Sequence, residues 1–176
     1  MSALLETRQN YFNGSWPLVG LGERTAAINA SMAIHIRGLR KSYGDLEAVG
    51  GVDLEIRRGE IFGLIGPDGA GKTSIFQILG GVMQATAGEA LVFGQTARDA
   101  RSQIGYLTQT FSLYQDLSVA ENLRYVGQLR KLRTREIEER GRHYLQLFDM
   151  DRFTDRLAGK LSGGMKQKLA LACALI

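Results

Sequence analysis

The sequence predicts an α/β fold in which a phosphate-binding loop joins a buried strand to a helix. The loop is Gly66–Thr73, which fits the pattern G-x-x-x-x-G-K-[ST] at every position. Before it, residues 61–65 form the short apolar run expected of a parallel strand buried on both faces. After it, apolar residues recur at helical spacing between Ile75 and Val82. We therefore expect the chain to bind a nucleoside triphosphate.

The residue types of this loop suit a polyphosphate. Its glycines let backbone N–H groups point at the phosphates, and the helix that follows adds its positive end. Lys72 supplies a cation for the β- and γ-phosphates, Thr73 a hydroxyl for Mg²⁺ and Ser74 one more donor. The alternative is a glycine-rich turn with an incidental lysine, which the flanking elements disfavour. The predicted nucleotide ligands here are Gly66, Pro67, Asp68, Gly69, Ala70, Gly71, Lys72, Thr73 and Ser74, and Lys72 is also assigned a catalytic role.

Composition and charge place the chain among ordinary globular proteins. It has 176 residues, 44% hydrophobic and 23% charged, enough for one domain with its own core. The net charge of +4 suits an anionic ligand or membrane surface without requiring nucleic acid. The single cysteine, Cys173, lies in an apolar run and is expected in the core. Residues 1–31 have no sustained period or secretion signal, so we expect a flexible extension on a cytoplasmic protein.

Two further candidate ligands lie beside predicted strands. From Ile34 to Ile56 the alternation of apolar and polar residues predicts half-exposed antiparallel strands, with a turn at residues 41–45. In that turn, Tyr43 could stack on a base, or it could simply pack at a strand end. Another strand is expected at residues 104–107. Gln109 follows it and could contact the metal or the attacking water, or it could be a solvated loop residue.

The last third of the sequence is mainly helical. Ser118 with Glu121 three residues later predicts a capping box, and the mixed charges that follow predict solvated helix faces and not a nucleic-acid patch. We leave His35 and His143 as structural or surface residues, since neither has ligand-like companions. At residues 161–168, a serine and paired glycines precede an apolar helix, which makes a second anion site.

Together these motifs resemble the ATP-binding cassette (ABC) family, over residues 33–176. The resemblance implies a P-loop NTPase fold of the ABC type, with a small antiparallel β subdomain and a helical subdomain at about 110–165 within a domain over 32–176. It also implies that Tyr43 stacks on adenine, and that Gln109 touches Mg²⁺, serves catalysis and senses a membrane subunit. Paired protomers are implied too, each signature closing over the other's nucleotide. The signature residues that would touch nucleotide are Ser162, Gly163, Gly164 and Met165.

Three stretches narrow the resemblance to ATP-binding subunits of bacterial drug exporters that work with a separate permease. They are residues 66–69, 113–123 and 157–168. Met165 stands where glutamine is commonest in the family, which removes the usual side-chain contact to the partner's nucleotide. No acidic residue follows Asp155, whereas the family continues into the Walker B aspartate and the catalytic glutamate. We therefore expect a C-terminally incomplete domain, truncated before Walker B, that binds ATP and hydrolyses it negligibly alone.

The resulting hypothesis is an ABC exporter ATPase that binds ATP and Mg²⁺ and drives multidrug efflux through a membrane permease. It is expected to pair with a second cassette, to bind no nucleic acid and to lie on the cytoplasmic face of the bacterial inner membrane. One alternative is a soluble ABC ATPase of the DNA-repair or translation type, although those usually carry coiled-coil insertions or paired cassettes. Another is a small-molecule kinase, which the signature at residues 161–165 argues against.

Overall fold

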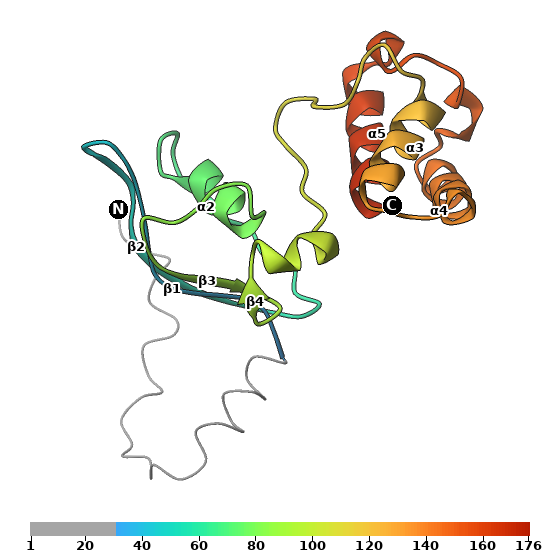
Figure 1. Cartoon of the computed structure of the whole chain (residues 1–176). Coiled ribbons are helices and arrows are strands. Elements are labelled where there is room, and N and C mark those ends of the chain that lie inside the picture. The colour runs from blue at the N-terminus through green and yellow to red at the C-terminus, as the bar shows by residue number, and fades with distance from the viewer. Residues whose placement is uncertain (1–30) are drawn as a thin grey trace.

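The structure is a computed structural model that describes residues 31–176, so the extension expected over residues 1–31 lies outside the described part except for Ser31. Figure 1 shows two groups of elements, an antiparallel sheet carrying one helix and a bundle of three helices, joined by an extended segment. Each group has its own core of buried apolar side chains. Within residues 31–176 no helix is long and apolar enough to cross a bilayer.

The sheet has four strands in the order β2-β1-β3-β4, and every neighbouring pair is antiparallel. Strands β1 (Met32–Tyr43) and β2 (Leu46–Arg57) form a long hairpin, which confirms the antiparallel strands predicted from alternation. The turn is tighter than expected, because β1 runs through Tyr43 and only Gly44 and Asp45 connect the strands. Strands β3 (Ala87–Val92) and β4 (Gln95–Thr96) complete the sheet.

Helix α2 (Lys72–Leu79) packs on this sheet and gives the first core its centre. Ile75, Ile78 and Leu79 are buried against sheet residues such as Ile36 and Leu39. The helix predicted after the loop is therefore confirmed as far as Leu79. Beyond that, Gly80 ends the helix, so Val82 lies outside it and is exposed.

Two predicted strands do not form. Residues 61–65 and 104–107 have no strand assignment, and Ile61 and Ile65 are almost fully exposed, at 101% and 94%. An apolar parallel strand needs hydrogen-bonding neighbours and cover on both faces. No strand among residues 31–176 pairs with either segment. The apolar sequence of residues 61–65 therefore indicated a segment that needs burial, but residues 31–176 contain no strand that covers or pairs with it.

The second group of elements consists of α3 (Val119–Leu129), α4 (Thr134–Leu147) and α5 (Gly163–Leu175), with short 3₁₀ turns at η2 (Asp151–Phe153) and η3 (Ala158–Lys160). A further 3₁₀ turn, η1 (Asp99–Gln103), belongs to the first group, since its Ala100 is buried in that core. The capping box is confirmed: Glu121 N donates to Ser118 Oγ at 3.2 Å, and Ser118 N donates to Glu121 Oε2 at 2.7 Å. This bonding lowers the pKa of the Glu121 carboxyl. Cys173 is buried in the bundle core as predicted, and burial raises the pKa of its thiol to about 12.

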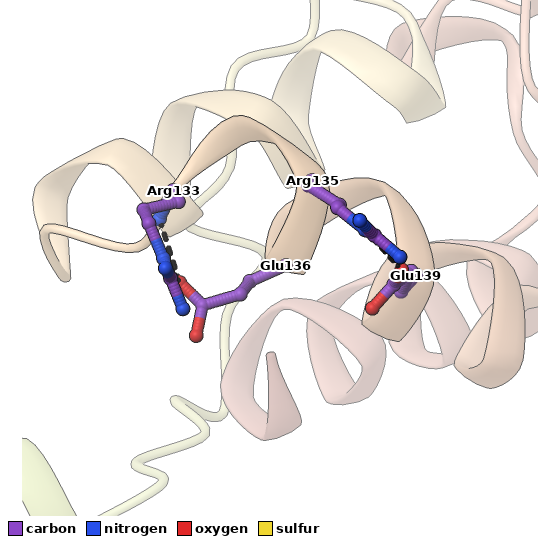
Figure 2. A network of polar contacts seen from close by, with 4 residues as sticks. All are labelled: Arg133, Arg135, Glu136 and Glu139. Carbon is purple, nitrogen blue, oxygen red and sulfur yellow. Dashed lines mark hydrogen bonds and ion pairs between the residues drawn. The ribbon is translucent and has the colours of Figure 1, made fainter.

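The charged residues of α4 form a solvated face, as the mixed signs predicted. Figure 2 shows two ion pairs along it, Arg133 with Glu136 and Arg135 with Glu139. Both arginine side chains are mostly exposed. Exposed pairs at three- and four-residue spacing are screened by water and contribute little, so they support the helix without fixing the fold.

Candidate nucleotide-binding site

The phosphate loop has the backbone that its glycines predict. Gly69 and Gly71 both adopt left-handed φ angles, of 82° and 79°, which side chains other than glycine rarely tolerate. Gly71 is also packed tightly against β2: an added Cβ would overlap the carbonyl oxygen of Ala48 and come within 2.9 Å of Val49 Cγ2. The loop is therefore shaped both by its own torsion angles and by the strand beside it.

Lys72 sits in the bend of the loop. Its ammonium donates hydrogen bonds to two loop carbonyl oxygens, those of Gly66 at 2.7 Å and Pro67 at 2.6 Å. Lys72 is the first residue of α2, so its charge and the positive end of the helix lie at the same place. This arrangement concentrates positive potential where a polyphosphate would be held.

Thr73 and Gln109 lie on one cleft of about 600 Å³, although 36 residues separate them in the sequence. Its lining also includes Lys72, Phe76 and Tyr106. A hydroxyl and an amide are hard oxygen donors of the kind that Mg²⁺ accepts beside phosphate oxygens and water. The two side chains therefore fit the metal that the sequence suggested for them. No carboxylate lines the cleft, and the described residues hold no cluster of three His, Cys, Asp or Glu side chains able to bind a metal.

Gln167 from α5 also lines this cleft, and sequence reasoning did not select it. It lies five residues after Ser162, on the helix that the signature opens. The one sequence feature that could have indicated Gln167 is its position close to that motif. A single glutamine on a helix belongs to no binding motif by itself. The cleft is thus where the phosphate-loop group and the helical bundle meet.

Tyr43 lies at the end of β1, and 45% of its surface is exposed. Its hydroxyl is 3.0 Å from Ser74 Oγ and donates to Met83 Sδ at 3.1 Å. The Lys41 ammonium lies 5.1 Å from the ring centroid. The base-stacking candidate is therefore tied directly to the first turn of α2. Ser74, which the sequence predicts to contact a phosphate, is buried, and its hydroxyl lies within hydrogen-bond distance of the Tyr43 hydroxyl.

The signature residues open helix α5. Ser162 is its N-cap, and Ser162 Oγ accepts a hydrogen bond from Met165 N at 3.3 Å, which confirms the predicted cap. An added Cβ at Gly163 or Gly164 would meet no atom within 4 Å, so the helix start is open. Met165 packs partly against the bundle core. None of these four residues lines the cleft around Lys72, so within one chain the predicted second anion site lies outside that cleft.

The loop, the helix behind it and the adjoining sheet define a phosphate-loop protein of the α/β class. The family model described as "ABC transporter" matches residues 49–176, and the chain belongs to this family, with the fold of an ABC ATPase. The resemblance read from the motifs is thereby confirmed at the level of the family.

Individual relatives support the same assignment. The chain is 39% identical over 147 residues to "Probable multidrug ABC transporter ATP-binding protein YbhF" of Escherichia coli (strain K12), an alignment that covers 81% of this chain and 25% of the relative. It is 38% identical over 151 residues to "Sulfate/thiosulfate import ATP-binding protein CysA" of Methylococcus capsulatus (strain ATCC 33009 / NCIMB 11132 / Bath), covering 82% and 43%. A solved structure titled "Structure of ATP binding subunit of ABC transporter" superposes with a TM-score of 0.72 at 29% identity, covering 80% of this chain and 60% of that one.

Two facts follow from these alignments. The chain spans less than half the length of the two curated relatives. The relatives also include both an importer and a multidrug transporter by name, so family membership leaves the direction of transport open.

Proposed function

We propose that this protein is the ATP-binding subunit of an ABC exporter and couples ATP binding and hydrolysis to efflux through a separate membrane permease. The observation that carries the proposal is the phosphate loop bent around the Lys72 ammonium at the start of α2. Two carbonyl oxygens already draw the cation into the loop, so a triphosphate would meet a charge held in place.

In this proposal the backbone of Gly66–Thr73 cradles the phosphates and Lys72 neutralises their charge. Thr73 and Gln109 would hold Mg²⁺ from the shared cleft, and the bound ion would neutralise charge as the terminal phosphate leaves. Gln109 would also orient the attacking water. Tyr43 supplies the ring on which adenine stacks.

The signature takes a different role because it does not reach the loop of its own chain. Ser162, Gly163, Gly164 and Met165 would bind the nucleotide held by a second cassette, so ATP would draw two protomers together. The open start of α5 supports this, since its exposed glycines leave the helix end accessible to an anion from outside the chain.

Export of a drug rests on the resemblance of three stretches to bacterial drug exporters and on one relative named as a probable multidrug transporter. The protein would then act on the cytoplasmic face of the inner membrane. A soluble ABC ATPase without a permease is the alternative. The helical bundle favours a transporter subunit over the soluble alternative. Its three described helices contain no coiled-coil insertion of the kind that soluble cassettes often carry.

Transport in cells tests the proposal. A full-length protein that contains this chain is co-expressed with a candidate membrane permease, and accumulation of a panel of fluorescent cationic drugs is followed. We expect energy-dependent efflux of at least one compound, abolished by Lys72→Ala. Uptake in place of efflux would contradict export. A protein that neither co-purifies with the membrane protein nor changes drug accumulation would instead be the soluble alternative.

A further inference from the structure

The aromatic ring of Tyr43 has a cation over one of its two faces. The Lys41 ammonium lies over the ring, 5.1 Å from its centroid. This is inside the range of about 6 Å within which a cation is attracted to the negative face of an aromatic ring. Both residues belong to β1, and side chains two residues apart on a strand point to the same side of the sheet. The strand itself therefore brings the cation to the ring.

A hydrogen bond holds the ammonium in this position. Lys41 Nζ donates to the carbonyl oxygen of Gln84 at 3.1 Å, in the segment that follows α2. The next residue of β1 is fixed to the same segment, because Ser42 N donates to Thr86 Oγ1 at 3.0 Å. A lysine side chain has many rotamers when it is free. The bond to Gln84 therefore limits the charge to positions near the ring.

The ring is held at its hydroxyl end by the same segment. Tyr43 Oη donates to Met83 Sδ at 3.1 Å, and Met83 directly precedes Gln84. Lys41 and Tyr43 thus bind neighbouring residues, one through its ammonium and the other through its hydroxyl. The ring and the cation therefore form one unit in which their relative position is fixed.

We propose that Lys41 is a positioning residue for the purine base: its ammonium covers one face of the Tyr43 ring and leaves the opposite face for stacking. This rests on the proposed function, in which adenine stacks on Tyr43. The face of an aromatic ring is negative, and a cation draws that charge toward itself. The opposite face then repels the π electrons of a purine less, so stacking there is strengthened as well as directed.

The position of Lys41 also separates it from the predicted phosphate contacts. It does not line the cleft that contains Lys72, Thr73 and Gln109. Its effect should therefore depend on the presence of a base, whereas the effect of Lys72 should depend on the phosphates. This difference makes the two lysines distinguishable by their ligands.

Calorimetry of the purified chain with Mg-ATP and with Mg-tripolyphosphate, which has no base, tests this inference. Lys41→Met keeps a side chain of similar length and removes the charge. It should weaken ATP binding about twofold to fivefold, the size of an exposed cation–π interaction, and leave tripolyphosphate binding unchanged. Lys41→Arg keeps a cation and should restore most of the wild-type affinity for ATP. Lys160→Met, the matched control, removes an exposed charge elsewhere and should change neither affinity.

A double-mutant cycle separates a role at the ring from a role elsewhere. Tyr43→Ala removes the ring, so adding Lys41→Met to it should cause no further loss of ATP affinity. A second neutral variant, Lys41→Gln, should bind both ligands as Lys41→Met does. Thermal melting without ligand identifies any variant that has lost its fold, and Lys41→Gln replaces Lys41→Met in the cycle if the latter does not fold.

The possible results separate this inference from the proposed function. If folded Lys41→Met binds ATP like the wild type, the inference is wrong while the nucleotide site stands. Tighter ATP binding would overturn it too, because the cation would then occupy the face that the base needs. An equal loss of ATP and tripolyphosphate binding would show that Lys41 serves the phosphates, which also contradicts the inference. If the wild type binds neither ligand, the proposed function itself fails, and the inference falls with it.

Discussion

Three alanine substitutions in the phosphate loop should damage the protein in a definite order. Gly66, Gly69 and Gly71 all belong to the motif, but the structure makes different demands at each. Gly66 lacks a left-handed φ, and an added Cβ would lie 3.5 Å from Ala70 Cβ, an ordinary contact. Gly69 has a left-handed φ of 82° with open space around it. Gly71 combines a left-handed φ of 79° with the overlap on Ala48.

The magnitudes follow from these geometries. Gly66→Ala should change the free energy of unfolding by no more than about 0.5 kcal/mol. Gly69→Ala should cost about 1–2 kcal/mol of backbone strain, partly offset by a less flexible unfolded chain. Gly71→Ala adds a steric overlap worth about 1–3 kcal/mol, so its total should reach about 2–5 kcal/mol. The overlap falls on a backbone atom of β2 and not on the end of a flexible side chain, so relieving it requires a shift of backbone.

Urea denaturation followed by far-ultraviolet circular dichroism measures the three free energies without any ligand. Gly69→Ala serves as the matched control for Gly71→Ala, since both carry the same strained φ and only one meets Ala48. Equal stability of these two variants would refute the packing argument. A Gly66→Ala variant that is the least stable of the three would refute the assignment of φ angles as well.

Three other predictions concern the helical bundle. Ser162→Arg should leave ATP binding by the monomer intact but block ATP-driven dimerisation of a full-length version. Light scattering of a hydrolysis-deficient full-length protein with ATP tests this, and dimers that persist in the variant would show that the signature does not lie at the nucleotide interface. Hydrogen bonding to Ser118 lowers the pKa of the Glu121 carboxyl in the folded protein below its usual 4.5. The ionised carboxylate therefore adds to the free energy of unfolding above pH 4.5, and this contribution is lost as the pH falls through the lowered pKa. Glu121→Gln keeps an acceptor but cannot titrate, so between pH 6 and 3 the wild type should lose more stability in urea titrations than the variant, and parallel losses would contradict this. Cys173, with a thiol pKa raised to about 12, should react with a thiol reagent at pH 8 only after unfolding, and rapid labelling of the native protein would show an open core.

Local patterns predicted much of what the structure shows. Alternation identified the β1 and β2 hairpin, and a serine three residues before a glutamate identified the start of α3. The glycine pattern placed the phosphate loop ahead of α2. These signals work because each depends on neighbours within a few residues of sequence.

Features that depend on distant partners could not be read in this way. The apolar run at residues 61–65 indicated a need for burial, but whether a strand forms depends on neighbours that no local pattern supplies. The bond between Ser74 and Tyr43 spans 31 residues, and Gln167 reaches the cleft only through the path of α5. Sequence reasoning therefore selected both Ser74 and Tyr43 but did not predict that they touch.

The central claim is that Lys72 and its loop bind the phosphates of ATP, and calorimetry with Mg-ATP tests it most directly. A charge-assisted contact is worth about 1.5–3 kcal/mol, so Lys72→Ala should weaken binding about tenfold or more. Lys160→Ala, which removes an exposed lysine far along the chain, is the matched control and should bind like the wild type. Equal affinity of the wild type, Lys72→Ala and Lys160→Ala would contradict the phosphate-loop assignment and the function built on it.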